Sequence, residues 1–266
     1  LEDLTNKFDL VIFDHPFIGE IAKKKLLLPL NEYLDEKFLQ DLSTNTIGSS
    51  YSSYVWKDNL YALPIDVAGH VSARRLDLFE KFGLSTPRNW EDVLDLARET
   101  SYSKGSMVVI PGFSVDLWCL FITISANSGV VPYSERGKFV PHEIGEKIFK
   151  YVKDLSDLSP KDSKSWNPIE TLDAMSSRDE FIYCPALFGY SNYSKSNFRK
   201  SKIVFGPLPD AGSGSVGGIL GGAGIGVSAK SRYPKEAIKI AEILSSAEIQ
   251  KSLYAEFGGQ PGHKGA

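Results

Sequence analysis

The sequence is poor in cysteine, carries no large excess of charge and contains no long hydrophobic run. Its two cysteines, Cys119 and Cys184, lie far apart in the chain, without the close spacing of metal or redox motifs. The 30 Lys and Arg against 33 Asp and Glu leave a net charge of -3, so the totals give no sign of a nucleic-acid or anionic-lipid partner. No apolar run approaches the roughly 18 residues that cross a bilayer. These absences favour a globular protein whose partner is small or neutral.

Motifs of catalysis and metal binding are missing as well. The four histidines show no metal-ligand spacing, and no G-x-S-x-G, H-E-x-x-H or P-loop string occurs. The stretch 212–217, GSGSVG, matches the dinucleotide pattern letter by letter, but a second glycine-rich segment follows where that pattern needs a helix. We therefore interpret 212–217 as a loop, and expect no metal, no cofactor and no enzymatic activity.

What the chain does contain is an alternation of strand-like and helix-like segments, with 42% hydrophobic residues to form a core. Residues 8–13, FDLVIF, predict a strand buried on both faces. Residues 90–100 predict a helix with Asn89 as its N-cap, and 52–65 predict a hairpin whose aromatic-rich arms flank a turn at Lys57, Asp58 and Asn59. The alternation predicts α/β architecture with mainly parallel pairing. Because no linker separates two halves, a chain with two lobes must pass back and forth between them.

Asp14 and His15 stand where the strand 8–13 ends. Adjacent residues on an extended chain point in opposite directions, so this pair is a poor candidate for an acid and a base acting on one atom. In open parallel sheets ligands collect at the carboxyl ends of strands, so one or both residues are expected to line a binding cleft. The alternative is that Asp14 caps a helix that begins after Pro16.

Aromatic residues lie beside polar ones in several strand-exit or loop positions. Trp118 is near Asp116, and Phe188 and Tyr190 precede a polar loop. Aromatic faces near amides and carboxylates suit a sugar, whose C–H face stacks while its hydroxyls need hydrogen-bond partners. For Trp118, core packing inside an apolar helix is an equally good interpretation. The glycines of 217–226 indicate either a close ligand or tight backbone packing.

The order of several motifs resembles one family. These are FDLVIFDHP, YALPID, STPRNWEDVLDLA, CPALFGYSNY, LGGAGIGVSAKSRYPKEAIKIAEIL and GGQPGH. In this order they resemble the extracellular sugar-binding proteins of ABC importers, the solute-binding family that includes the maltodextrin-binding protein. The resemblance spans nearly the whole chain. It implies the two-lobed, type II periplasmic-binding-protein fold, with lobes joined by crossing strands and no catalytic chemistry.

The resemblance also implies where the ligand is held. One lobe would comprise residues 1–67 and 223–255, and the other 68–222 and 256–266, with a carbohydrate or polyol in the cleft between them. The implied ligand-binding residues are Asp14, His15, Asp66, Trp118, Phe188, Tyr190, Gly221 and Gly222, and Gln260 is expected to approach the cleft. The implied partner is a membrane permease, and the implied state is a periplasmic or extracellular monomer, with a lipid anchor as an option in the precursor.

Two further expectations come with the resemblance. Family members begin with a strand and helix ahead of residues 8–13 and continue beyond GGQPG, so we expect this sequence to be part of a longer chain. The rival interpretations are a ligand-sensing module with the same fold, read by a receptor partner, and, with less support, an α/β enzyme.

Overall fold

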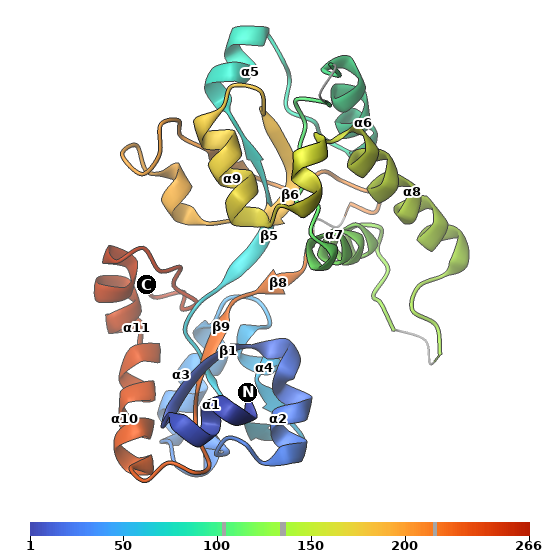
Figure 1. Cartoon of the computed structure of the whole chain (residues 1–266). Helices are drawn as coiled ribbons and strands as arrows, with labels where there is room; N and C mark the ends of the chain where they lie inside the picture. Colours follow the sequence, from blue (N-terminus) through green and yellow to red (C-terminus); the bar gives the residue numbers. More distant parts are fainter. Residues whose placement is uncertain (103–104, 134–136, 215–216) are drawn as a thin grey trace. The chain divides into compact units, whose positions relative to one another are not determined.

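The computed structural model describes residues 1–102, 105–133, 137–214 and 217–266. The chain forms two compact units. Unit 1 comprises Leu1–Ala68 and Leu220–Ala266, and unit 2 comprises Gly69–Ile219. The backbone therefore leaves unit 1 once and returns to it once (Figure 1).

A small antiparallel sheet forms the centre of unit 1. Its strands are β1 (Leu10–Asp14), β9 (Ala223–Val227) and β4 (Leu63–Pro64), in the order β1-β9-β4. Both β1 and β4 run antiparallel to β9. In unit 2 the strands β6 (Tyr183–Phe188) and β7 (Val204–Gly206) both pair antiparallel with β5 (Ala68–Arg74). The prediction of mainly parallel pairing was wrong for these strands, because alternation along the chain does not determine which strands meet.

The side chains of β1 alternate between core and solvent. Val11 and Phe13 are buried, whereas Ile12 between them is 58% exposed. The prediction that both faces of this strand are buried was therefore wrong. An all-apolar strand can leave one side chain in three exposed, since hydrophobicity alone does not say which face packs on the core.

Helices and short turns enclose the sheet of unit 1. They are α1 (Glu2–Lys7), η1 (His15–Phe17), α2 (Ile18–Lys24), η2 (Leu30–Glu32), α3 (Glu36–Asn45), α4 (Ser50–Ser53), α10 (Pro234–Ser245), α11 (Ala247–Ile249) and the π-helical turn η5 (Gln250–Tyr254). The hairpin of β2 (Val55–Trp56) and β3 (Asn59–Leu60) is confirmed. Its turn residues Lys57 and Asp58 both have positive φ, as two-residue hairpins favour.

The glycine-rich return into unit 1 is tightly packed. The short strand β8 (Leu220–Gly221) leads into Gly222, which has a φ of +125°. A Cβ atom at Gly222 would lie 2.2 Å from the carbonyl oxygen of Asp66, and one at Gly224 would lie 2.6 Å from the ring of Tyr54. Tight backbone packing, one of the two alternatives that the sequence left open, therefore requires glycine at these two positions.

The last residues of the chain also pack on unit 1. The amide of Ile47 donates to the Gly262 carbonyl at 2.9 Å, and the amide of Val67 donates to the Gln260 carbonyl at 3.1 Å. The amide of Lys264 donates to the carbonyl of Asn45 at 2.7 Å. Assigning 256–266 to the other lobe was therefore wrong, because these long-range backbone bonds have no signal in the local sequence.

Strand β6 is buried on both faces in unit 2. Every residue of β6 except Phe188 is buried. The segment around Val108 lies beside β6 through a single parallel bridge to Tyr183, so the strand predicted there is reduced to one bridge. The packed helices are α5 (Leu76–Phe82), α6 (Trp90–Glu99), α7 (Ser114–Asn127), α8 (His142–Leu158) and α9 (Pro168–Ser177), with 3-10 turns η3 (Lys161–Ser165) and η4 (Ser191–Ser194).

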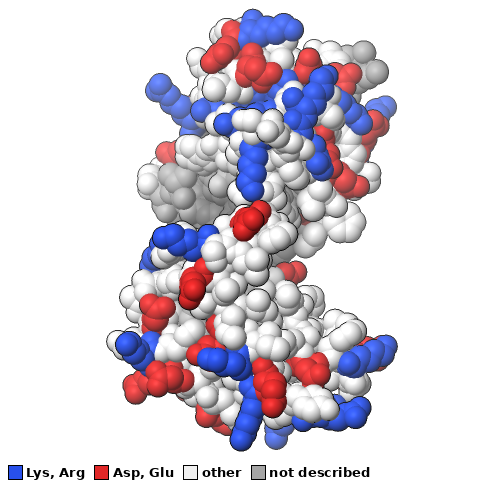
Figure 2. Space-filling view, turned by 90° about the vertical axis from the view of Figure 1, so that its left-hand side faces the viewer, with Lys and Arg blue, Asp and Glu red and all other residues white. Residues whose placement is uncertain are grey.

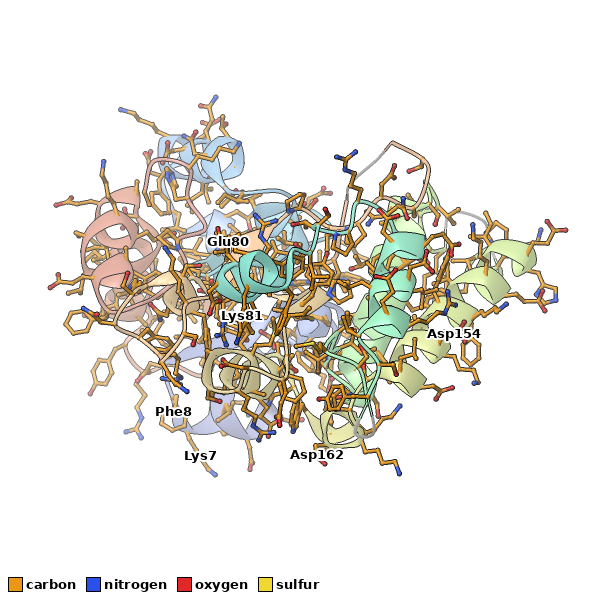
Figure 3. All side chains as sticks on the ribbon, turned by 90° about the horizontal axis from the view of Figure 1, so that it is seen from above. Lys7, Phe8, Glu80, Lys81, Asp154 and Asp162 are labelled. Carbon is orange, nitrogen blue, oxygen red and sulfur yellow. The ribbon has the colours of Figure 1, made fainter. Side chains whose placement is uncertain are left out.

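Local capping signals in unit 2 are clear. Asn89 caps α6 as predicted, accepting a hydrogen bond from the amide of Asp92 at 2.9 Å. Helix α9 was not predicted from the sequence, although Asn167 and Glu170 form a full capping box at its start. Glu80 and Lys81 of α5 extend into solvent (Figure 3).

Of the GSGSVG loop, Ser215 and Val216 lie outside the described residues, and no helix follows Gly217 before β8.

Candidate functional site

Tyr54 organises the polar end of the sheet in unit 1. Its hydroxyl lies 3.4 Å from the carbonyl oxygen of Phe13, one residue before the end of β1, and 3.3 Å from that of Gly222. Its ring packs edge-on against Phe13 and His15. The side chain is 1% exposed. The buried side chain of Tyr54 therefore links the end of β1 to Gly222, the residue that precedes β9.

Asp66 lies in the same region and has two hydrogen-bond donors. The hydroxyl of Tyr254 donates to its Oδ1 at 2.7 Å, and the amide of Gln260 donates to the same oxygen at 3.2 Å. Burial raises the pKa of Asp66, the two hydrogen bonds oppose that rise, and the negative charge of Asp14 adds to it. The side chain is half-buried, so the carboxylate is positioned and still accessible.

Asp14 is an exposed carboxylate at the end of β1. It is the N-cap residue of η1, yet its side chain makes no capping hydrogen bond. The capping interpretation of Asp14 is therefore wrong. Its charge also acts on Tyr54 and Asp66, raising the pKa of both, which places the two carboxylates in one electrostatic neighbourhood.

His15 follows Asp14 and is only partly exposed. Burial lowers its pKa, and the negative charge of Asp14 partly offsets that effect. The imidazole is therefore largely neutral at pH 7, with one nitrogen able to donate and the other able to accept a hydrogen bond.

Unit 1 thus brings together several residues that sequence reasoning selected: Asp14, His15, Asp66, Gly222 and Gln260. Gly221, beside them, is half-buried in β8. Tyr54 and Tyr254, which hold this group together, were not selected from the sequence. The motif YALPID begins only seven residues after Tyr54, but no spacing rule connects residue 54 or 254 to Asp66.

The remaining selected residues belong to unit 2, where Trp118 leads an aromatic cluster. Its ring stacks on Phe139 with centroids 4.8 Å apart and on Phe121 at 5.8 Å. Tyr133 meets the edge of Phe139 at 4.8 Å. Trp118 is 49% exposed, so the interpretation of this residue as core is wrong. The cluster presents a broad, partly open aromatic face.

Phe188 packs against a buried histidine. The rings of His70 and Phe188 have centroids 4.4 Å apart, and the Nδ1 of His70 lies 2.8 Å from the Thr123 hydroxyl. That hydroxyl also accepts from the amide of Ile219 at 3.2 Å. Burial lowers the pKa of His70 to about 3, so the imidazole is neutral where it packs against the Phe188 ring. Tyr190, half-buried, precedes η4.

Asp116 is a buried acid that the sequence analysis noted only as a neighbour of Trp118. It is 7% exposed, in the first turn of α7. Burial raises its pKa to about 6, and its charge adds to the burial that raises the pKa of Cys119 to about 11. Both cysteines are buried free thiols. Within the described ranges no three His, Cys, Asp or Glu side chains gather as a metal site, and no helix is long and apolar enough to cross a membrane.

A family model described as bacterial extracellular solute-binding protein matches residues 4–251. The chain belongs to this family. Family membership implies a periplasmic or extracellular location, and the family consists of binding proteins. The resemblance drawn from the motif order is therefore confirmed.

Solved structures of other solute-binding proteins share the fold. Maltose-bound MalE3 of T. maritima is 20% identical, with a TM-score of 0.79, and the match covers 97% of this chain and 67% of that one. A protein of Agrobacterium radiobacter K84 in complex with ribitol is 17% identical, with a TM-score of 0.82 and coverages of 98% and 68%. A protein of Thermotoga lettingae TMO bound with alpha-D-tagatose is 19% identical, with a TM-score of 0.79 and coverages of 99% and 69%. The predicted two-lobed periplasmic-binding-protein fold is confirmed.

Proposed function

We propose that this protein is the substrate-binding component of an ABC importer for a carbohydrate or a related polyol. Each unit, taken by itself, carries side chains of the kinds that contact sugars. The solute-binding proteins of similar fold that hold maltose, ribitol and tagatose support this ligand class. The single observation that carries the proposal is the grouping of Asp14 and Asp66 around Tyr54, because two neighbouring carboxylates are strong acceptors for ligand hydroxyls.

The carboxylates have different tasks in this proposal. Asp66 is oriented by Tyr254 and Gln260, so a ligand hydroxyl would meet a carboxylate whose direction is already set. Asp14 has no capping task, and its oxygens are free to accept from the ligand. His15, being neutral, can either donate or accept. Preorganised acceptors reduce the ordering that binding requires.

The aromatic face in unit 2 supplies the second kind of contact. Trp118, supported by Phe121 and Phe139, offers a partly exposed ring face to the apolar C–H face of a sugar. Phe188 and Tyr190 add aromatic surface from the end of β6. Gly221 and Gly222 contribute backbone near Asp66. We assign no catalytic step to any of these residues.

The transport context follows from the same proposal. A loaded protein would deliver its ligand to a membrane permease, acting as a monomer. It would work in the periplasm or outside the cell, with a lipid anchor in the precursor as one way to hold it near the membrane.

Titration calorimetry against maltose, ribitol, mannitol and tagatose tests the proposal. At least one sugar or polyol is expected to bind, and Asp14→Asn is expected to weaken that ligand about 10- to 100-fold, because a hydrogen bond to a charged group contributes about 1.5–3 kcal/mol. Asp66 is a poorer probe, since its loss would also release Tyr254 and Gln260. Asp14 avoids this difficulty because its side chain makes no capping hydrogen bond, and no group within the described ranges donates to it.

Asp58→Asn is the matched control. Asp58 is an exposed aspartate of the same unit, at a positive φ that asparagine adopts easily. This variant should keep the affinity of the parent protein. Binding by Asp14→Asn as tight as that of the control would remove Asp14 from the site, and no binding to any sugar or polyol in a broad panel would contradict the ligand class.

A further inference from the structure

A loop in unit 2 concentrates positive charge that the composition of the whole chain conceals. Between Glu180 and Asp210 the sequence has no acidic residue, but it has Lys195, Arg199, Lys200 and Lys202. We name residues 195–202 the basic loop. The chain as a whole has a net charge of -3, so the surplus is local and belongs to one surface.

The basic loop is held firmly at both ends. The amide of Ile203 donates to the Tyr193 carbonyl at 3.0 Å, and the Ser194 hydroxyl donates to the Ile203 carbonyl at 2.9 Å. Inside the loop, the amide of Ser201 donates to the Ser176 carbonyl of α9 at 2.9 Å. In Figure 1 the loop extends to the left of α9. It is therefore a fixed projection whose cationic side chains face solvent.

Most of this charge is not neutralised. The Nε of Arg199 lies 2.7 Å from an oxygen of Asp173, which also accepts from the Tyr193 hydroxyl at 2.8 Å. Lys195, Lys200 and Lys202 are exposed, and within the described part of the chain no carboxylate lies within 4.0 Å of their amines. Figure 2 looks onto the side of the molecule from which the loop extends, and Lys and Arg gather on that face of unit 2.

An aromatic side chain lies in the middle of these cations. Phe198 is 37% exposed. The Arg199 guanidinium lies 4.3 Å from the centre of its ring, and the Tyr193 ring meets it edge-on at 5.1 Å. Aromatic and cationic side chains together are typical of protein surfaces that lie in the headgroup region of a membrane. A purely ionic site for an acidic protein would not need the ring.

We propose that the basic loop binds the surface of an anionic phospholipid bilayer. The three unpaired lysines supply the attraction to lipid phosphates, and Phe198 enters the headgroup region. Attraction of this kind acts only within about 8 Å at physiological ionic strength, so the loop binds reversibly and only at the membrane surface. The inference goes beyond sugar binding and uses none of the residues assigned to the ligand.

Co-sedimentation of the whole protein with vesicles tests this proposal. Vesicles of phosphatidylglycerol and phosphatidylcholine in equal parts are expected to bind the protein in 0.1 M NaCl, and pure phosphatidylcholine vesicles are not. Each lysine is expected to contribute about fivefold in binding. The triple variant Lys195→Gln, Lys200→Gln, Lys202→Gln should therefore lose roughly a hundredfold and fall to background.

The matched control replaces three exposed lysines elsewhere, as Lys150→Gln, Lys235→Gln and Lys251→Gln. It has the same net charge as the first triple variant and should keep most of the binding. Equal loss in both variants would overturn the proposal, as would equal binding to both kinds of vesicle. Binding to poly-glutamate but not to anionic vesicles would also overturn it, in favour of an acidic macromolecule. Sugar affinity should not change in either variant.

Discussion

Replacing Asp116 by Asn should stabilise unit 2 at neutral pH. Asp116 is 7% exposed, and burial raises the pKa of its carboxyl from 3.8 to about 6. Within the described residues no side chain donates a hydrogen bond to it. Asn has nearly the same shape as a protonated Asp and carries no charge at any pH. The variant therefore removes a buried charge without creating a cavity.

The size of the effect follows from the difference in pKa between the folded and unfolded protein. The folded protein holds this proton to a higher pH, so stability falls as the pH rises from about 4 to about 6 and is constant above that. A difference of about two pKa units corresponds to about 3 kcal/mol. Loss of a negative charge in the first turn of α7 offsets about 0.3–1 kcal/mol. We expect Asp116→Asn to gain about 2 kcal/mol at pH 8 and nothing at pH 4.

Urea unfolding followed by tryptophan fluorescence at pH 4 and pH 8 measures this difference. With a slope of about 2 kcal/mol/M, the midpoint of the transition of unit 2 should rise by about 1 M at pH 8. Asp162→Asn, which changes an exposed aspartate in the same unit (Figure 3), should leave the midpoint nearly unchanged. A gain by Asp116→Asn that is equal at both pH values, or absent at pH 8, would refute the reasoning.

Two further substitutions test the packing and the capping described above. Gly222→Ala should lower the free energy of unfolding of unit 1 by more than about 3 kcal/mol, because its Cβ would lie 2.2 Å from the Asp66 carbonyl oxygen at an unfavourable φ. The control is Gly69→Ala, because a Cβ atom there would have open space around it. A similar thermal transition in both variants would contradict the argument. Asn167→Ala should lower the free energy of unfolding of unit 2 by about 1 kcal/mol, because the capping box of α9 is lost. An unchanged thermal transition would mean that the box does not stabilise the unit.

Local features of the fold were readable from the sequence because the residues that determine them are close together in the chain. Asn89 was identified as a cap from the acidic and apolar residues that follow it. The turn of the hairpin was identified at Lys57, Asp58 and Asn59 from the aromatic arms on both sides, although Asn59 begins β3. The family was recognisable from the order of its motifs. Asn31 shows the opposite case, since its side chain accepts from the amide of Leu60 at 2.9 Å, a contact across 29 positions that no local pattern indicates.

The candidate site was readable only in part. Asp14 was selected because it follows an apolar strand, and Asp66 because it stands in the YALPID motif. Their common neighbourhood depends on Tyr54, whose hydroxyl lies near the Gly222 carbonyl, and on Tyr254 and Gln260, which donate to Asp66. No periodicity connects residues this far apart, so the sequence could not show that these groups act on one another.

The sequence alone therefore determined the α/β class, the solute-binding family and the helix that Asn89 caps, all of which depend on short-range patterns. Tertiary structure decided the antiparallel pairing of β9 with β1 and β4, the exposure of Ile12 and Trp118, and the return of the last residues to unit 1. These features depend on which surfaces meet. That choice is made by packing and hydrogen bonding between distant segments, where each residue's own neighbours in the chain carry no information.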